Sequence, residues 1–240
     1  MGNLKNLYGN NIRKFGVHSI FGWNALAWNQ ALKRAIAPAN VELPDKCHIL
    51  EIGAGPNSIM SLILDDPKNS LTVGYYNQNY KHKIKARLDD LSLESVYQTR
   101  WIDINDLDGK FDVILLKSVL GGLFRSPKSA KQKINKLIKK VVQQNLNTEG
   151  ILITLDNGSS GFETLINKFG ARKNNWYFFN LHTLENQTFQ SSFGFLSAFS
   201  VITRLGPTFK IIEHFMYFLD HLIGFFYHKY PTIICNFYKK

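Results

Sequence analysis

The sequence predicts an α/β protein built on a doubly wound, mostly parallel sheet of seven strands, and three observations support this prediction. Short apolar segments alternate with helical segments, and the connections between them are short. The segment from Phe111 to Leu116 is apolar on both faces, as a central parallel strand should be. The length of 240 residues is enough for one large domain. We expect this single domain to comprise an N-terminal helical cap (residues 1–45), a central core (46–160) and a C-terminal helical elaboration before the last strand (161–240).

The elements of the cap and the core follow from hydrophobic periodicity. Apolar residues between Trp23 and Ile36 recur at helical spacing, and Pro38 and Pro44 mark the end of the cap. Helical segments then separate five apolar segments of strand length, so we expect right-handed parallel connections. The predicted strands run from Cys47 to Ile52, Leu71 to Tyr76, Val96 to Ile102, Phe111 to Leu116 and Ile151 to Leu155. The predicted helices run from Ser58 to about Leu64, from about Lys81 through Arg87, and from Ser129 to Asn145.

The C-terminal part is rich in aromatic residues. We expect a strand from Phe189 to Phe195, an apolar helix from about Pro207 to Tyr227, and a last strand from Thr232 to Tyr238. The helix is apolar most of the way round, but Glu213 and Asp220 within it argue against a segment that spans a bilayer. The sequence favours packing of this helix against the sheet or a dimer partner, with partial membrane insertion as the alternative. It leaves the oligomeric state open.

The chain is strongly basic, with a formal net charge of +11 and a pI near 9.6. Such a charge favours contact with phosphates, anionic lipid headgroups or acidic glycans. Two lysine clusters, at 81–87 and 128–140, fall on predicted helices, and the first interpretation of each is a solvated helix face. An anionic membrane and nucleic acid are the alternatives. Because no segment matches a known nucleic-acid-binding module, we expect nucleic acid to be an unlikely partner.

The sequence also predicts a location in the cytoplasm. The first residues lack the apolar segment of a signal peptide, and no charge-free apolar stretch reaches the ~18–20 residues that span a bilayer. The two cysteines, Cys47 and Cys235, lack the spacing of a zinc site, so we expect both to be reduced and buried. These features predict a cytoplasmic protein, at most peripheral to the inner membrane face.

A glycine-rich turn at the end of the first predicted strand marks the candidate ligand site. The strand ends in Glu51, and the chain passes through Gly53, Ala54 and Gly55 to Asn57. Glycines let the backbone approach a ligand closely, and a helix N-terminus offers free N–H groups. The carboxyl edge of a parallel sheet is where ligands bind in such folds. A tight strand–helix turn without a ligand would have the same pattern.

The chain resembles the class I S-adenosylmethionine-dependent methyltransferases, which have a Rossmann-like fold, over residues 45–160. The matching pieces are Leu50-Glu51-Ile52-Gly53-Ala54-Gly55, Leu71 to Tyr76, Trp101-Ile102-Asp103, Phe111 to Leu116 and Glu149-Gly150-Ile151-Leu152-Ile153. The resemblance implies S-adenosyl-L-methionine as the cofactor, with its methionine part along the glycine turn. It also implies that Asp103 binds the adenine amino group and that Ile104 packs on the ring. A turn or helix-capping aspartate is the alternative for Asp103.

Two positions depart from the pattern of that family. The third glycine is replaced by Asn57, the residue other than glycine that best tolerates a left-handed backbone. The second strand ends in Tyr76-Asn77, where the family normally has an acidic residue that binds both ribose hydroxyls. Asn77 can accept one such hydrogen bond, without the strength of a charged acceptor. We therefore expect an unusual ribose contact that involves Tyr76 or Asn77.

The residues beside the turn predict metal-independent transfer to oxygen or nitrogen. The motifs of amino-group and carbon-5 nucleobase methylases are missing from the sequence. The family's metal-dependent members need carboxylates after both the fourth and fifth strands; Asp156-Asn157 ends the fifth, but Lys117 ends the fourth and would repel a divalent cation. His18 in the cap is the candidate base, and Lys117 is expected to contact the cofactor or orient an anionic acceptor. Tyr177 and His182 are further candidates.

A second resemblance concerns the acceptor. The run from Lys117 to Gly122, the cap segment Gly22 to Gln30, Trp176-Tyr177 and Gly194-Phe195-Leu196 resemble a branch of the same family associated with bacterial surface-polysaccharide genes. This resemblance implies a small molecule or a lipid-linked glycan as the acceptor. Two alternatives stay open: an RNA or other nucleic-acid methyltransferase, and a non-catalytic binding protein that retains the fold.

Overall fold

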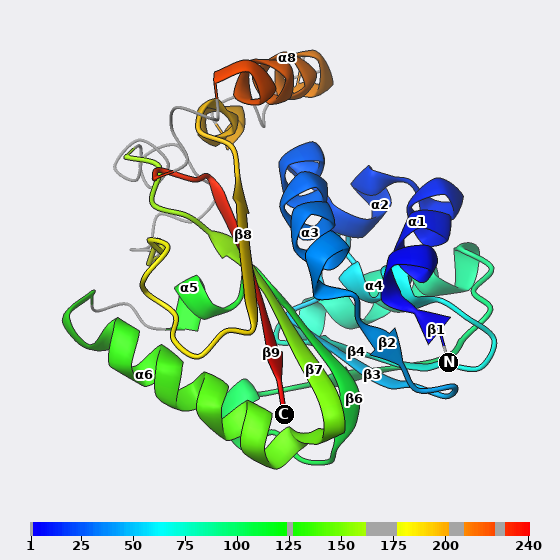
Figure 1. Cartoon of the computed structure of the whole chain (residues 1–240). Helices are drawn as coiled ribbons and strands as arrows, with labels where there is room; N and C mark the ends of the chain where they lie inside the picture. The colour runs from blue at the N-terminus through cyan, green and yellow to red at the C-terminus, as the bar shows by residue number, and fades with distance from the viewer. Residues whose placement is uncertain (1, 124–126, 162–176, 202–208, 224–228) are drawn as a thin grey trace.

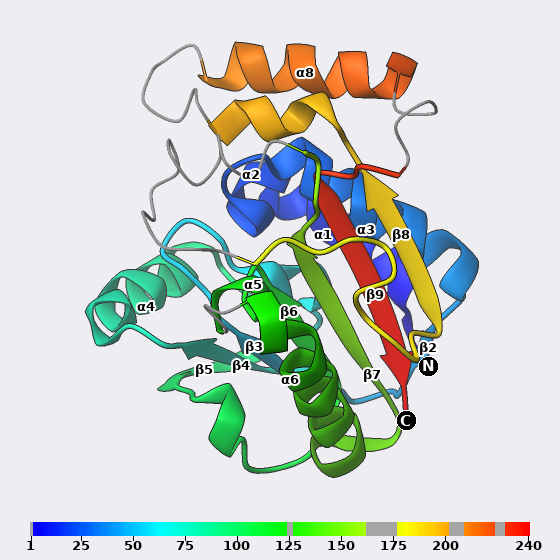
Figure 2. The same cartoon turned by 90° about the vertical axis from the view of Figure 1, so that its left-hand side faces the viewer.

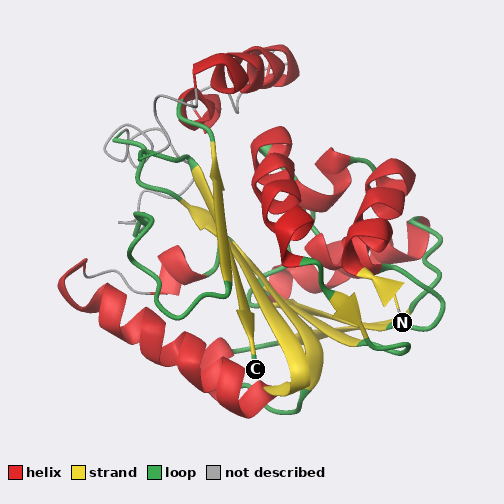
Figure 3. Ribbon diagram, in the orientation of Figure 1, coloured by secondary structure: helices red, strands yellow, loops and turns green. Residues whose placement is uncertain are grey.

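A seven-stranded sheet forms the centre of the molecule, which confirms the predicted fold (Figures 1 and 3). The computed structural model describes residues 2–123, 127–161, 177–201, 209–223 and 229–240. The strands, in spatial order, are β5 (Val96–Trp101), β4 (Ser70–Tyr75), β3 (His48–Ile52), β6 (Phe111–Lys117), β7 (Leu146–Asn157), β9 (Ile233–Lys239) and β8 (Phe189–Phe193).

The strand order makes the sheet doubly wound. Strands β5, β4, β3, β6 and β7 pair in parallel, whereas β9 runs antiparallel to both of its neighbours, β7 and β8. The chain moves outward from β3 to β4 and β5, then returns to the other side of β3 for β6 and β7. The order therefore reverses between β3 and β6, and such a switch point opens a ligand-binding crevice at the carboxyl ends of the strands.

The N-terminal residues pack against one face of the sheet as three helices, α1 (Leu4–Phe15), α2 (Val17–Phe21) and α3 (Ala25–Ala39) (Figure 1). Helix α4 (Lys81–Asp90) lies on the same face, and its Ile84 and Leu88 share the core with residues of α1–α3. Strands β1 (Gly2–Asn3) and β2 (Glu42–Leu43), which the sequence did not predict, pair at the two ends of the cap. The N-terminal cap therefore shares the hydrophobic core with the sheet and covers this face of it.

Helices α5 (Leu120–Leu123) and α6 (Pro127–Lys140) cover the opposite face, seen toward the viewer in Figure 2. Ile134, Leu137 and Ile138 of α6 are buried, and the lysines of this helix with described side chains lie on its outer side. This exposure is consistent with a solvated helix face, and the solvated-face interpretation of α6 stays a prediction. The predicted helix to Asn145 ends in a π-helical turn, η4 (Val141–Asn145), and the Asn145 side chain donates to the Leu107 and Gly109 carbonyls.

The C-terminal helix α8 (Phe209–Ile223) lies at the top of the molecule in Figures 1 and 2, above the 3₁₀ helix η5 (Leu196–Val201). The remaining ends of the predicted helix, residues 207–208 and 224–227, and Trp176 fall outside the described residues. Over the described part of the chain, no helix is long and apolar enough to cross a membrane.

One predicted element is wrong. No α-helix begins at Ser58 after the glycine turn; a short 3₁₀ helix, η1 (Met60–Leu64), takes its place. All five residues of η1 are buried and four of them are apolar, so its sequence lacks the periodicity that separates helix types. The helix begins at Met60 and not at Ser58 because the Glu51 carboxylate accepts hydrogen bonds from the Met60 and Ser61 N–H groups.

Candidate functional site

The candidate site lies where β3, β4 and β5 end side by side. Ile52 pairs with Gly74, and Tyr75 pairs with Trp101, so the residues that follow each strand meet at one edge. The backbone N–H of Ile102 also donates to the Tyr75 carbonyl (3.0 Å). The structure therefore brings the predicted glycine turn, Tyr76-Asn77 and Asp103-Ile104 to the same edge of the sheet.

The glycine turn has a conformation that only glycine adopts easily. Gly53 has φ +89°, and a Cβ atom there would lie 2.5 Å from Cγ2 of Val119. The N–H groups of Gly53 and Ala54 both donate to the carbonyl of Gly74, at 3.0 and 2.9 Å. Gly74 is equally constrained, because a Cβ atom on it would lie 2.7 Å from the Glu51 carbonyl oxygen. The first part of the turn is thus fixed by the neighbouring strand.

The second part of the turn is a small hairpin. Gly55 and Ser58 exchange two backbone hydrogen bonds of 3.0 Å each, with Pro56 and Asn57 at the tip. Asn57 is exposed, and its φ is not positive. The turn therefore does not use the tolerance for a left-handed backbone that asparagine offers at this position.

Glu51 fixes the start of η1. Its carboxylate is buried and accepts hydrogen bonds from the Met60 N–H (2.9 Å), the Ser61 N–H (2.8 Å) and the Ser61 hydroxyl (2.8 Å). Burial raises the pKa of Glu51, while these hydrogen bonds oppose the rise. The first N–H groups of η1 are consequently occupied, so they do not form the free helix N-terminus that the sequence predicted. Glu51 braces the turn from inside the protein.

The end of β4 presents a polar and an aromatic group. Tyr76 is half-exposed, and its ring meets that of Tyr80 edge to face at 6.2 Å. Asn77 caps the 3₁₀ helix η2 (Gln78–Tyr80) by accepting from the Asn79 N–H (3.0 Å). An amide that caps a helix through its oxygen still has its NH₂ group, and its oxygen has a second lone pair.

Asp103 and Ile104 follow β5 as the sequence predicted. Asp103 is exposed and caps the 3₁₀ helix η3 (Ile104–Asp106), accepting 2.9 Å bonds from both nitrogens of Asn105. Only Oδ1 is used in these bonds. Ile104 is buried against Ile102 and the α6 face. The capping role weighed as the alternative for Asp103 is present, and it is compatible with ligand binding through Oδ2.

Lys117 is buried at the end of β6, and not solvated as a strand-terminal lysine often is. Its ammonium nitrogen lies 4.7 Å from the ring centroid of Trp28, a fully buried residue of α3. The same charge opposes the rise that burial causes in the pKa of Glu51 and of Asp156, so Lys117 acts as a counter-charge to two buried carboxylates. This geometry favours a structural role for Lys117; its contact with cofactor or acceptor stays a prediction.

Asp156 is fully buried on β7. Among the described residues, neither of its carboxylate oxygens has a hydrogen-bond partner. The backbone N–H groups at the start of α5 favour its charged form but do not reach hydrogen-bond geometry. Burial raises the pKa of Asp156 to about 7. No group of three or more His, Cys, Asp or Glu in the described part of the chain is arranged to hold a metal ion.

His18 lies on α2 beside a carboxylate of the C-terminal helix. Its Nδ1 is 3.9 Å from Oε2 of Glu213, whose side chain is 1% exposed. The other oxygen of Glu213 accepts from the Leu26 N–H (3.2 Å), whereas Oε2 has no hydrogen-bond partner among the described residues. Glu213 is thus a buried acceptor next to the candidate base, and its only signal in the sequence is a charge within an apolar helix.

Arg87 joins the cap to the glycine turn, which the sequence did not predict. Its guanidinium donates to the Pro56 carbonyl (2.6 Å) and to the Ser19 carbonyl (2.7 Å). The Ser58 hydroxyl adds a bond to the carbonyl of Ile20 (3.3 Å). Helix α2, which carries His18, is therefore fastened directly to the tip of the turn.

The two remaining candidates lie on the α5–α6 face. Tyr177 donates its N–H to the Gly121 carbonyl (2.9 Å) and packs edge to face on Phe179. His182 is exposed in a loop whose Thr183 carbonyl accepts from Asn135 of α6. Tyr177 thus lies near the loop after β6, whereas His182 lies along α6, away from the glycine turn.

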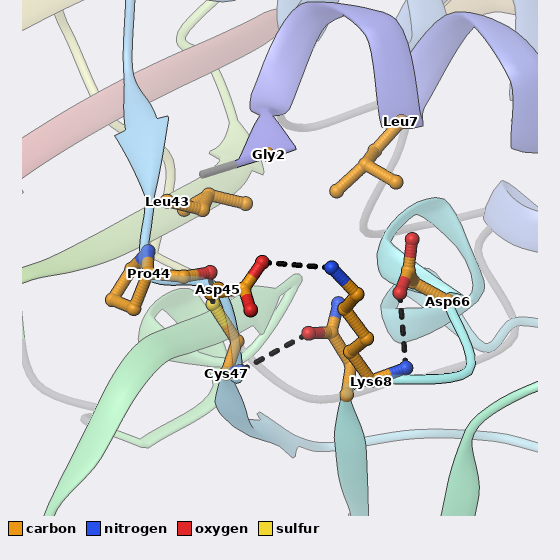
Figure 4. A pocket seen from close by; sticks show the side chains of 9 residues that line it. Gly2, Leu7, Leu43, Pro44, Asp45, Cys47, Asp66 and Lys68 are labelled. Carbon is orange, nitrogen blue, oxygen red and sulfur yellow. Dashed lines mark hydrogen bonds and ion pairs between the residues drawn. The ribbon is translucent and has the colours of Figure 1, made fainter.

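A separate pocket of about 210 Å³ lies at the opposite edge of the sheet (Figure 4). It is near the amino ends of β3 and β4, and residues from the N-terminus and the segment 66–69 line it. The ion pair between Lys68 and Asp45 (2.8 Å) closes part of it. Parallel sheets bind ligands at their carboxyl edge, so this pocket does not belong to the candidate site.

Comparisons with known proteins identify the fold. No family model and no curated protein matches the sequence. Among solved structures, coclaurine N-methyltransferase bound to N-methylheliamine and SAH is similar with 12% identity and a TM-score of 0.57, over 99% of this chain and 86% of that one. The cyclopropane synthase MmaA2 from Mycobacterium tuberculosis has 12% identity and a TM-score of 0.57, over 89% and 82% of the two chains.

A third structure extends the match over both whole chains. A putative sarcosine dimethylglycine methyltransferase from Galdieria sulphuraria is similar with 11% identity and a TM-score of 0.57, over 98% of each chain. At such low identity the likeness establishes the fold and leaves the chemistry to the residues of the site.

Proposed function

We propose that this protein is an S-adenosyl-L-methionine-dependent methyltransferase that transfers the methyl group without a metal to oxygen or nitrogen of a small molecule or a lipid-linked glycan. The observation that carries the proposal is the junction of three strand ends. A glycine-constrained turn, a polar β4 end and an exposed Asp103 lie along one edge at the switch point of a fold shared with methyltransferases.

The residues present fit this cofactor. At Gly53 and Gly74 a side chain would collide with the protein itself, so the turn needs these glycines for its own packing, whereas the position of a Cβ atom on Gly55 is open space that a ligand can occupy. Asp103 has an unused carboxylate oxygen for the adenine amino group, and Tyr76-Asn77 offer a hydroxyl and an amide to the ribose. The bound cofactor would supply an electrophilic methyl group on a sulfonium. The internal hydrogen bonds of Glu51 and Arg87 would hold the turn in the binding conformation.

In this proposal His18 accepts the proton from the acceptor hydroxyl or amine. Helix α2 holds His18 at the turn through the contacts of Ser19 and Ile20, and Glu213 lies beside its ring, with Oε2 3.9 Å from Nδ1. A carboxylate at one ring nitrogen orients the imidazole and favours acceptance of a proton at the other. His18 is thus the candidate catalytic residue, and Glu213 is a positioning residue.

The acceptor class rests on different support. The sequence resemblance to the polysaccharide-associated branch favours a glycan, and the similar structure of coclaurine N-methyltransferase is bound to the small molecule N-methylheliamine. Both fit an acceptor that approaches the same edge of the sheet. A non-catalytic role that retains the fold is the competing hypothesis, because β4 ends without the usual acidic residue.

The experiment is to incubate the full chain with S-adenosylmethionine labelled in the methyl group, together with glycan, lipid and RNA fractions of bacterial cells. We expect label in the glycan or lipid fraction. His18→Gln should lower the rate by about 10²-fold or more, as expected for loss of a general base, without changing cofactor affinity. Label in RNA alone would contradict the proposed acceptor, and cofactor binding without transfer to any fraction would favour the non-catalytic alternative.

A further inference from the structure

Helix α8 carries a continuous stripe of exposed apolar side chains. Ile211, Phe215, Phe218 and Leu222 are 72%, 56%, 58% and 59% exposed. At about 3.6 residues per turn these four positions lie within one arc of the helix surface. The sequence favoured packing of this helix against the sheet or a dimer partner. The four exposed side chains do not pack against the sheet, so contacts within this chain do not account for them.

The opposite side of α8 is acidic and is anchored to the protein. Glu213 and Asp220 lie about 180° from the apolar stripe, and each is 1% exposed. Asp220 accepts from the N–H groups of Phe195 (2.8 Å), Leu196 (2.7 Å) and Ser197 (2.8 Å), while Glu213 accepts from Leu26. Both acidic residues of α8 are therefore turned inward, and its outer face carries the apolar stripe, flanked by the exposed His214 and His221, without negative charge.

We propose that this outer face of α8 docks on an anionic lipid bilayer. A helix with one apolar face, held parallel to the surface and free of outward acids, has the form of an interfacial membrane-binding helix. The formal charge of +11 adds long-range attraction to a negatively charged surface. The aromatic and aliphatic side chains of the stripe, Ile211, Phe215, Phe218 and Leu222, enter the headgroup region of the bilayer.

A second copy of the chain fits the stripe less well. The four side chains expose on the order of 500 Å² together, whereas a stable interface buries about 800 Å² on each partner. Pairing two copies through α8 would also bring two bodies of charge +11 together. An anionic bilayer has the opposite charge and sets no minimum on the area of contact.

The position of α8 connects the docking surface with the candidate site. Glu213 on the inner side of α8 lies against His18, and α2 is bonded to the tip of the glycine turn. Figure 1 places α8 beyond α2 and α3, at the end of the sheet where β7 terminates. Docking would bring the site's edge toward the lipid surface, which deepens the proposed function by favouring a lipid-linked acceptor; the docking itself does not depend on catalysis.

Vesicle flotation of the full chain tests the proposal. We expect wild-type protein to float with phosphatidylcholine vesicles that contain phosphatidylglycerol at low salt, and not with phosphatidylcholine alone. Each exposed phenylalanine removed should weaken binding about tenfold, so Phe215→Ser/Phe218→Ser should lose about a hundredfold. Val96→Ser, which changes an exposed apolar residue (75%) on the far edge strand β5, is the matched control and should bind as wild type does.

Three results would overturn the proposal: no flotation of the wild type, equal flotation of the double variant, or equal binding to neutral vesicles. Sedimentation velocity shows whether the stripe pairs copies; a wild-type dimer that the double variant dissociates would assign the face to a second copy. If the double variant misfolds by circular dichroism, Ile211→Ser/Leu222→Ser replaces it. Because vesicle binding is measured without cofactor, its failure leaves the proposed methyl transfer untouched, and failure of methyl transfer leaves docking intact.

Discussion

Replacing Asp156 by asparagine should change how the stability of this protein depends on pH. Asp156 is fully buried on β7 with a pKa of about 7, compared with an ordinary value of 3.8. In the unfolded chain the carboxyl loses its proton near pH 4, whereas the folded protein keeps the proton until about pH 7. Between these values the unfolded state binds fewer protons, so the free energy of unfolding falls as the pH rises.

The magnitude follows from the size of this shift. At about 1.4 kcal/mol per pKa unit, the shift of Asp156 costs about 4 kcal/mol once the pH exceeds both values. About 2.5 kcal/mol of that cost develops between about pH 5 and pH 8, where most proteins are measurable. Asparagine has nearly the same shape and does not ionise, so the variant avoids this loss.

Urea unfolding of wild type and Asp156→Asn at a series of pH values measures the effect. The difference in unfolding free energy, variant minus wild type, should rise by about 2.5 kcal/mol from about pH 5 to pH 8. Other titrating groups contribute equally to both proteins and cancel in the difference. If the unfolding free energies of the two proteins changed with pH in parallel, the prediction would be wrong, because Asp156 would then titrate in the folded protein as it does in the unfolded chain.

Three further predictions concern the candidate site. Gly53→Ala should destabilise the protein by about 1–3 kcal/mol in thermal unfolding, because φ at Gly53 is +89° and the added Cβ would lie 2.5 Å from Val119. Gly9→Ala is the control and should not destabilise the protein, because its Cβ would meet nothing within 4 Å. Equal stability of the two variants would contradict the geometry of the turn. Asn77→Asp should keep the cap on η2 and tighten S-adenosylmethionine binding about tenfold, because a carboxylate is the stronger ribose acceptor; unchanged affinity in calorimetry would place the ribose elsewhere. Glu213→Gln should lower kcat more than tenfold with little change in KM if Glu213 positions His18, and a change in KM alone would speak against that role.

The sequence was sufficient to predict the core strands and a mostly parallel sheet because the hydrophobic pattern of each core strand is local. Residues 113–116 of β6 are all apolar since helices cover both faces of this strand, and the glycines at Gly53 and Gly74 lie where a side chain cannot fit. The rule that ligands bind at the carboxyl ends of parallel strands therefore predicted the ligand site at the ends of these strands.

The contacts that assemble the site join distant segments, so they could not be predicted in the same way. Arg87 belongs to a basic helix with three lysines, and only tertiary packing brings its guanidinium to the carbonyls of Ser19 and Pro56. The Glu51 carboxylate delays the start of η1 through bonds to Met60 and Ser61, which no local pattern reports. Long-range polar contacts, more than hydrophobic periodicity, decide which predicted residues face a ligand.

The central claim is that the edge formed by β3, β4 and β5 binds S-adenosylmethionine, and calorimetric titration with S-adenosylhomocysteine is its most direct test. We expect saturable binding by wild type and about 10- to 100-fold weaker binding by Asp103→Ala, which loses a charged hydrogen-bond acceptor. Asp106→Ala, which changes another exposed acid of η3, is the matched control and should bind as wild type does. Absence of binding at millimolar ligand, or equal weakening by the two variants, would contradict the account.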